Sequence, residues 1–426
     1  MKYIYTSDIS LETTFCECIF NNLPDAKGLW LPKNIPTINK IFINNLNQYS
    51  FIDIAKKVLD VFIEDIPKKN LHAIIEKSFT FLPELIKLDK DKFILELFHG
   101  PTFAFKDFGA AFMGNLYEYL SDSNINVITA TSGDTGGAVA NAFYNKKKIK
   151  VFVLYPKNKV SKLQEKQMTT LGNNIFPIEV EGTFDDCQKL VKKTLNDKNI
   201  NIKIVSANSI NIARLLPQVL YYFYLYKKLL EFNIKKNIVV SVPSGNLGNL
   251  TSGIIAKKMG IPIDKFICSL NSNKTFYDYI KLKQYNPRKS IQTLSSAMDV
   301  GNPSNFIRLK YLYNDDSIEK DIKCFFFSDN DTINSIINTD KDYNYLVDPH
   351  TAIGLCGVES FKTNNNYTYV TLSTAHPAKF KKEIESKTQI IVEIPKKLLE
   401  LMHKTTNKIT IKNDYNIWIN ILKFYQ

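Results

Sequence analysis

The sequence predicts an α/β protein built on an open, mostly parallel sheet with helices on its faces. Two observations support this prediction. From about residue 93, apolar segments with strand character alternate with segments of helical spacing, and polar or glycine-rich turns join them. A strand at 126–130, a helix at 138–144 and a strand at 150–155 have the spacing of a βαβ unit, whose two strands are parallel. Such alternation is typical of α/β folds.

The preceding segment, residues 1–92, has a different pattern, and we expect it to form a mainly helical N-terminal region. Apolar residues recur at three- and four-residue spacing in residues 51–63, which predicts an amphipathic helix, and residues 71–79 predict a second one. We therefore divide the chain into this region, at 1–92, and an α/β region at 93–426.

The α/β region continues the alternation toward the C-terminus. The same patterns predict helices at 160–171, 185–195, 212–230 and 250–259, and strands at 176–180, 202–205, 238–242, 266–270 and 367–372. Pro217 falls in the first turns of the third of these helices, where a proline is tolerated.

The net charge of +13 would by itself suggest a nucleic-acid partner. Only three of the 55 basic residues are arginine, however, and no basic motif with interleaved aromatic residues is present, so we expect no nucleic acid. The six cysteines have no disulfide or zinc spacing, and no apolar run reaches the ~18 residues of a membrane span. The sequence therefore predicts a cytoplasmic protein without a metal site or a membrane partner.

Lys106 is the candidate for covalent chemistry, because it lies among Phe103, Phe105 and Phe108. Apolar surroundings disfavour the charged form of an amine and lower its pKa. A neutral lysine amine is a nucleophile that forms an imine with a carbonyl group. The alternative is a surface lysine whose aliphatic stem covers aromatic rings.

The turn after the strand at 238–242 is the strongest candidate for an anion site. It runs PSGNLGN from Pro243 to Asn249 and leads directly into the predicted helix at 250–259. Gly245 and Gly248 let the backbone bend and expose its N–H groups, and a helix N-terminus adds partial positive charge. The turn therefore has the properties of a phosphate cradle, and a plain strand-to-helix turn is the alternative.

Three further polar turns follow predicted strands. Residues 131–136 offer hydroxyl and amide groups suited to a carboxylate, and the alternative is helix capping by Ser132, Asp134 or Thr135. Residues 206–211 are followed by Arg214, whose guanidinium suits a phosphate, and an ordinary salt bridge is its alternative. Thr374, after the last strand, could make a single hydrogen bond or cap the next helix.

An imine-forming lysine, two anion sites and a carboxylate-sized turn fit a cofactor that carries both an aldehyde and a phosphate, which is pyridoxal 5′-phosphate. No acidic residue stands out as a partner of the pyridine nitrogen. A hydroxyl such as that of Thr374 would leave this nitrogen unprotonated, which suits elimination and replacement more than transamination.

Six motifs, in one order along the chain, resemble those of the threonine synthase family. They are HGPTFAFKDF, TATSGDTGGAVANAFY, LYPKNKVSKLQEKQ, SANSINIARLL, VPSGNLGNLTSG and STAHPAKF. The resemblance covers most of the chain and implies the fold type II architecture of pyridoxal-phosphate enzymes. That architecture has two open, mostly parallel sheets flanked by helices, with a smaller α/β subdomain, here roughly residues 110–210, inserted in the larger domain.

The resemblance also implies residue roles. Lys106 would hold the cofactor covalently, and Thr374 would face its pyridine nitrogen. The residues that would bind the cofactor phosphate are Gly245, Asn246, Leu247, Gly248 and Asn249. The substrate carboxylate would be bound by Ser132, Gly133, Asp134 and Thr135, and the substrate phosphate by Asn208, Ser209 and Arg214. Many fold type II enzymes have Asn where this chain has Asp134, so Asn208 becomes a candidate partner of the cofactor's 3′-oxygen.

The activity that this resemblance implies is the conversion of O-phospho-L-homoserine and water to L-threonine and phosphate, the last step of threonine biosynthesis. Lys106 would act as general base at Cα and then move protons at Cβ and Cγ, and Arg214 would stabilise the departing phosphate. The alternative is a related fold type II lyase, such as a threonine or serine dehydratase or a phospho-lyase. We expect a monomer or a homodimer.

Overall fold

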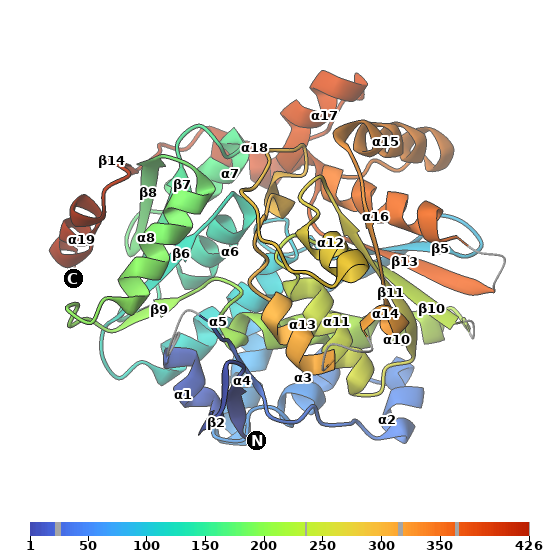
Figure 1. The fold of residues 1–426 in the computed structure, drawn as a ribbon, viewed down its shortest axis with the longest axis horizontal. Helices are drawn as coiled ribbons and strands as arrows, with labels where there is room; N and C mark the ends of the chain where they lie inside the picture. Colours follow the sequence, from blue (N-terminus) through green and yellow to red (C-terminus); the bar gives the residue numbers. More distant parts are fainter. Residues whose placement is uncertain (22–26, 235–236, 314–317, 363–365, 426) are drawn as a thin grey trace.

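Two large sheets organise the computed structural model, which describes residues 1–21, 27–234, 237–313, 318–362 and 366–425 (Figure 1). The larger sheet contains, in spatial order, β12 (Ile322–Phe326), β11 (Ile263–Leu270), β10 (Asn237–Pro243), β13 (Tyr367–Ser373), β5 (Lys92–Glu96) and β4 (Glu84–Lys87). All neighbours in it are parallel except β4, which is antiparallel to β5. The central strand β10 is apolar and buried along nearly its whole length, as expected for a strand covered on both faces.

The smaller sheet is parallel throughout. It contains, in spatial order, β14 (Ile409–Lys412), β8 (Ile175–Glu181), β7 (Ile149–Pro156), β6 (Ile125–Ala130) and β9 (Ile204–Ser206). The predicted α/β class with open, mostly parallel sheets is confirmed.

The helices of the smaller sheet follow the predicted alternation. They are α6 (Asp134–Phe143), α7 (Lys162–Thr169) and α8 (Phe184–Asn196). The predicted helix at 212–230 is divided into α9 (Ile212–Leu215), the 3-10 turn η2 (Leu216–Val219) and α10 (Leu220–Glu231). Pro217 lies inside η2, where the missing N–H and the ring favour a local change of helix type.

The helices around the larger sheet begin with α11 (Gly248–Lys258), which follows β10. The others are α12 (Thr275–Leu282), η3 (Ser296–Met298), α13 (Phe306–Tyr313), α14 (Ile318–Asp321), α15 (Asp329–Tyr343), α16 (Pro349–Phe361), η4 (Pro377–Phe380), α17 (Lys381–Thr388) and α18 (Lys396–Met402).

Helix α5 (Lys106–Leu120) is packed between the N-terminal region and the smaller sheet, and Lys106 is its first residue. A Cβ at Gly109 would lie 2.6 Å from the Arg214 carbonyl oxygen, and a Cβ at Gly114 would lie 2.5 Å from the Ala142 carbonyl oxygen. These glycines therefore let the backbone of α5 approach α9 and α6 closely.

The N-terminal region contains the predicted helices, as α3 (Phe51–Leu59) and α4 (Lys68–Ser78), together with α1 (Phe15–Phe20), α2 (Lys40–Asn44) and η1 (Leu46–Gln48). It also contains a small antiparallel sheet, of order β2 (Asp8–Thr13), β1 (Tyr3–Tyr5) and β3 (Trp30–Pro32), that the sequence analysis did not predict. Phe51 of α3 packs edge-to-face on Phe108 of α5 and on Tyr224 of α10, so this region supports the helix that begins with Lys106.

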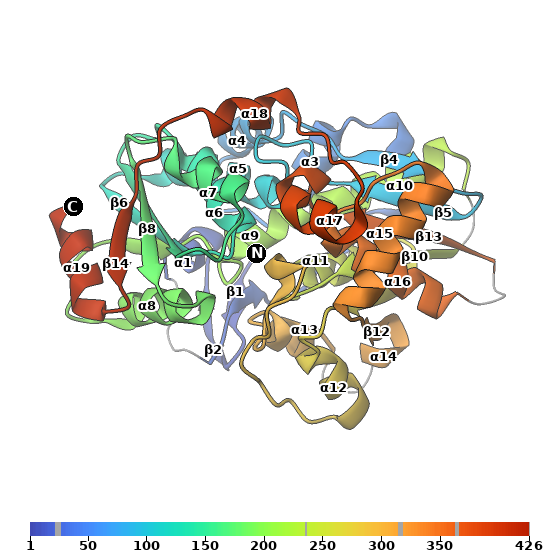
Figure 2. The ribbon, with the colours of Figure 1, turned by 90° about the horizontal axis from the view of Figure 1, so that it is seen from above.

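The C-terminal segment leaves the larger sheet after α17 and returns to the smaller one, where β14 and α19 (Tyr415–Phe424) lie beside β8 and α8 (Figure 2). The buried Trp418 donates a hydrogen bond to Thr194 Oγ1 of α8 at 2.8 Å. This return was not predicted, because a four-residue strand carries little pattern. Among the residues that the structure describes, none lies in a helix long and apolar enough to cross a membrane.

Candidate active site

A single pocket contains nearly all of the predicted site residues. It lies beyond the carboxyl ends of strands from both sheets, where parallel sheets bind ligands. The predicted residues that line it are Lys106, Ser132, Asp134, Thr135, Asn208, Ser209, Arg214, Gly245, Asn246, Leu247, Gly248, Asn249 and Thr374. Gly133 lies just behind this lining: its φ is +143°, and a Cβ there would overlap Gln164 at 2.5 Å. Lining residues that the sequence analysis missed include His350, Met298 and Gln218.

Lys106 is held at the pocket by the strand end that carries Thr374. Phe105 N–H donates to the Thr374 carbonyl oxygen at 2.9 Å, and His376 N–H donates to the Phe103 carbonyl oxygen at 3.1 Å. The Lys106 Nζ lies 4.0 Å from Asp134 Oδ2. Burial lowers the pKa of Lys106; Asp134 opposes this effect, and the nearby cations Lys379 and Arg214 add to it.

The predicted aromatic setting of Lys106 is only partly right. Its Nζ lies 5.4 Å from the centroid of the Phe105 ring. Phe108 instead points into the core against Phe81, and Phe103 packs on His376. Sequence neighbours on a helix and on its preceding turn point in different directions, so burial of the whole pocket accounts for the lowered pKa.

The turn between β10 and α11 has the shape of an anion cradle, but its glycines act differently from what was predicted. The residue with positive φ is Leu247, at +59°, and not a glycine. Gly245 is required by a close approach, because a Cβ there would lie 2.7 Å from the Met298 Cα. At Gly248 the nearest atom to a Cβ would be 3.4 Å away. The first N–H groups of α11 have no carbonyl partner within the helix, so they are available to an anion.

Asn249 supplies a side-chain donor to the same cradle. Its Oδ1 accepts hydrogen bonds from Tyr221 at 2.6 Å and from Tyr222 at 2.7 Å. Its buried Nδ2 has no hydrogen-bond partner among the described residues. A buried donor without an acceptor is costly, and a bound phosphate would remove that cost. The cradle therefore fits the phosphate group of pyridoxal phosphate.

Arg214 is a buried cation without an ion-pair partner among the described residues. Only 3% of the residue is exposed, its Nη1 donates to the Ala207 carbonyl oxygen at 2.6 Å, and its Nε has no partner among those same residues. Burial lowers its pKa to about 10, and the nearby Asp107 opposes this shift. The salt bridge considered as an alternative role is therefore absent from the described part of the chain, and the guanidinium remains suited to an anionic ligand.

The turn between β6 and α6 is capped differently from the proposed alternative. Thr131 Oγ1 accepts from the N–H groups of Gly133 and Gly136, both at 2.9 Å, so none of the three side chains considered for capping serves as the cap. The Asp134 carboxylate pairs with Lys379 at 2.7 Å and accepts from Gln164 at 2.8 Å. An ionised carboxylate repels another one, so the groups in this turn that suit a substrate carboxylate are backbone N–H groups and hydroxyls.

The side chains of Asn208 and Ser209 already make hydrogen bonds to other groups of the protein. The Asn208 amide bonds both backbone groups of Ala130, accepting at 3.1 Å and donating at 2.8 Å. One of its two N–H bonds therefore stays available to a ligand. Ser209 Oγ accepts from the amide groups of Asn246 at 2.8 Å and Asn305 at 3.2 Å. Ser209 thus connects the turn after β9 to the cradle after β10.

The helix after Thr374 is capped by His376, whose Nδ1 accepts from Ala378 N–H at 3.1 Å. The capping alternative for Thr374 is therefore wrong, and Thr374 lines the pocket.

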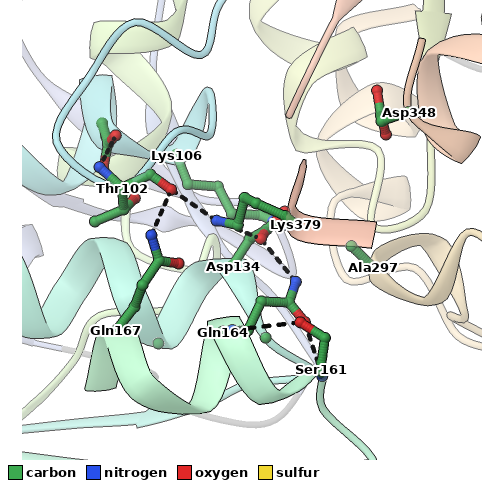
Figure 3. A network of polar contacts seen from close by, with 12 residues as sticks. Thr102, Lys106, Asp134, Ser161, Gln164, Gln167, Ala297, Asp348 and Lys379 are labelled. Atoms are coloured by element: carbon green, nitrogen blue, oxygen red, sulfur yellow. Dashed lines mark hydrogen bonds and ion pairs between the residues drawn. The ribbon is translucent and has the colours of Figure 1, made fainter. Parts of the chain in front are cut away.

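The sequence analysis missed three buried groups that support the site. Lys379 is completely buried beside Asp134 (Figure 3). His350 pairs with Asp348 at 2.5 Å and accepts from Ala297 N–H at 3.2 Å. Arg308 donates to the carbonyl oxygens of Ser209 and Ile210. The scarcity of arginine could have drawn attention to Arg308, and Lys379 lies in the motif STAHPAKF, whose resemblance assigned a role only to Thr374. We found no sequence signal for His350.

Comparison with known proteins identifies the class of enzyme. Residues 82–374 match the family model described as pyridoxal-phosphate dependent enzyme. Together with the two parallel sheets, the pocket lysine and the phosphate cradle, this match makes the chain a fold type II pyridoxal-phosphate enzyme, and pyridoxal phosphate is its cofactor.

More specific matches define the family. Residues 2–79 match the model of the threonine synthase N terminus, and residues 351–420 match that of the threonine synthase C-terminal region. The chain is 40% identical over 405 residues to threonine synthase from Buchnera aphidicola subsp. Acyrthosiphon pisum, covering 93% of this chain and 94% of that protein. It belongs to the threonine synthase family.

Solved structures agree with this assignment. The crystal structure of threonine synthase from Escherichia coli superimposes with a TM-score of 0.95 at 35% identity, covering all of both chains. Pyridoxal-phosphate-bound threonine synthase from Brucella melitensis superimposes with a TM-score of 0.92 at 30% identity, covering 100% of this chain and 99% of that one.

Proposed function

We propose that this protein converts O-phospho-L-homoserine and water to L-threonine and phosphate. Membership of the threonine synthase family gives the class of reaction, and the pocket supports this particular substrate. The observation that carries the proposal is that Lys106 and the uncompensated Arg214 line one pocket together with the glycine-rich cradle. One anion site suits the cofactor phosphate, and a separate buried guanidinium suits a second phosphate.

The cofactor, when bound, withdraws electrons from the Cα of an attached amino acid and so makes its proton acidic. In the proposed reaction Lys106 takes the Cα proton, because its lowered pKa favours the neutral amine that can act as a base. The same nitrogen then moves protons at Cβ and Cγ, so that phosphate leaves from Cγ and water adds at Cβ. No other amine of the described residues lines this pocket.

Two turns of the smaller sheet orient the substrate in this proposal. The N–H groups of residues 134 and 135, with the hydroxyls of Ser132 and Thr135, bind the substrate carboxylate, and Gly133, whose N–H is bonded to Thr131, shapes the turn. Arg214, with Asn208 and Ser209, binds the substrate phosphate and stabilises the charge that develops as it leaves. We further propose that the free N–H of Asn208 is the partner of the cofactor's 3′-oxygen and that the Thr374 hydroxyl faces the pyridine nitrogen.

A product assay tests the reaction. Purified protein loaded with pyridoxal phosphate is incubated with O-phospho-L-homoserine, and inorganic phosphate, threonine and 2-oxobutyrate are measured together. We expect equal amounts of phosphate and threonine. Formation of 2-oxobutyrate from added L-threonine, without phosphate release from O-phospho-L-homoserine, would instead identify a dehydratase.

A further inference from the structure

A buried lysine outside the predicted site lies next to the proposed catalytic lysine (Figure 3). Lys379 belongs to η4, and its side chain has no exposed surface. Its Nζ lies 2.7 Å from Asp134 Oδ1 and donates a hydrogen bond to the Thr102 carbonyl oxygen at 2.8 Å. A buried ammonium group is costly unless it is paired and hydrogen-bonded, so these contacts fix the position of the group.

Asp134 faces both lysines. Its Oδ1 bonds Lys379 and the amide of Gln164, whereas its Oδ2 lies 4.0 Å from the Lys106 Nζ. Burial alone would raise the pKa of Asp134, but Lys379 and Lys106 outweigh this effect and lower it, so the carboxylate is ionised. Lys379 therefore opposes the effect of the Asp134 charge on Lys106.

Two other charged groups also act on the Lys106 amine. Arg214 of α9 also disfavours the charged form of Lys106, and Asp348 before α16 favours it. Asp348 is already bonded by His350 and Thr351. Asp134 and Lys379, which pair with each other, therefore have the two largest charge effects on the Lys106 amine.

Lys379 also holds the backbone segment that precedes Lys106. The Thr102 carbonyl oxygen accepts from Lys379 and from the Gln167 amide of α7 at 2.9 Å. Thr102 N–H in turn donates to Asp107 Oδ2 at 2.8 Å, at the start of α5. One buried ammonium group thus joins η4, α6 and the turn leading into α5.

We propose that Lys379 is a positioning residue for Lys106: it holds the Asp134 carboxylate beside the Lys106 amine and balances the charge of that carboxylate. This proposal rests on the proposed function, in which Lys106 carries the cofactor. It assigns to Lys379 no contact with the substrate.

The test is a spectroscopic pH titration of the cofactor-loaded protein, because the visible absorption of the bound cofactor reports the proton on the Lys106 nitrogen. Lys379→Met removes the balancing charge, and we expect the midpoint to move up by about one pH unit. Asp134→Asn removes the carboxylate, and we expect a shift in the opposite direction. Lys379→Arg keeps the charge and is expected to shift the midpoint less than Lys379→Met.

Lys382→Met is the matched control, because Lys382 is an exposed lysine three residues further along and should leave the midpoint unchanged. A Lys379→Met protein with full cofactor content and the parental midpoint would overturn the proposal, since a purely structural lysine would change only thermal stability. If Lys379→Met does not fold, Asp134→Asn decides: an unchanged or raised midpoint rejects the proposal. Visible absorbance retained in Lys106→Ala would reject the proposed function itself.

Discussion

On the side of the larger sheet the pocket offers neutral donors to an anion, whereas on the side of the smaller sheet it offers buried charge. The cradle after β10 consists of backbone N–H groups and the amide of Asn249, supported by two tyrosine hydroxyls. The other side contains Arg214 and Asp134, with Lys106 and Lys379 placed against them. Asp134 there lies near two lysines, and Arg214 has no ion-pair partner among the described residues.

This difference indicates that the two sides of the pocket suit different ligands. A neutral cradle can hold a permanently bound phosphate without a large desolvation cost when the site is empty. A buried guanidinium without a counter-ion is unfavourable alone and gains most when an anion arrives or negative charge develops, as in the departure of phosphate. The neutral side therefore suits a cofactor that stays, and the charged side suits a substrate that reacts and leaves.

The largest effect is expected at the charged side from Lys106→Ala. We expect activity to fall by about 10⁴-fold or more, because both the covalent attachment and the general base are lost. The visible absorbance of the bound cofactor should be lost as well. Lys147→Ala, at an exposed lysine, should change neither property. Turnover and colour that survive in Lys106→Ala would remove this residue from the site.

The second-largest effect is expected at Arg214, and it tests whether the two anion sites bind different groups. Arg214→Ala should lower kcat/KM for O-phospho-L-homoserine by about 100- to 1,000-fold, with a raised KM and a lower kcat, and leave cofactor content intact. The control is Arg288→Ala, because Arg288 is more than half exposed and pairs with Asp278 at 2.7 Å. If Arg214→Ala lost the cofactor instead, the division between a cofactor side and a substrate side would be wrong.

The neutral side is tested by Gly245→Ala. The added Cβ would lie 2.7 Å from the Met298 Cα, so either the cradle or η3 must shift. We expect the affinity for pyridoxal phosphate, measured by fluorescence titration of the stripped protein, to fall by about 10- to 100-fold. Gly248→Ala, where the closest atom is 3.4 Å away, should weaken binding less. Equal effects at the two glycines would show that the contact with Met298 does not determine the shape of the cradle.

The two sides also differed in how far the sequence predicted them. The cradle directly follows one strand and directly precedes one helix, so the pattern of neighbouring residues was enough to predict its position. The positive φ at Leu247 was missed, because this conformation is typical of glycine. The strands β6, β7, β10, β11 and β13 were predicted for the same reason, since each is a compact apolar run.

The charged side depends on contacts between distant parts of the chain. Lys379 follows Asp134 by 245 positions, and although it lies in the motif STAHPAKF, nothing in the local sequence shows that its amine is buried against Asp134. The return of β14 to β8 and the sheet of β1, β2 and β3 were missed for a related reason. Their strands have three to six residues, and only pairing with remote segments stabilises them.

The smallest expected effect concerns Asp299, a titratable residue on the neutral side of the pocket. Asp299 lies next to Met298, and its carboxylate accepts from Thr293 Oγ1 at 2.7 Å and from Asn271 Nδ2 at 2.9 Å. Burial raises its pKa to about 7, and these hydrogen bonds oppose the shift. The folded protein then binds a proton that the unfolded chain, with a carboxyl pKa of about 4, does not bind between these values.

The stability that protonated Asp299 contributes is therefore fully present below about pH 4 and is lost as the pH rises through about 7. In Asp299→Asn this pH dependence should disappear, so the difference in unfolding free energy between parent and variant should move in favour of the variant from pH 5 to pH 8. Urea unfolding at both pH values measures it, and Asp342→Asn serves as a control at an exposed carboxylate. A difference that stays constant with pH would mean that Asp299 is ionised throughout, and that the neutral side has no titratable support at this position.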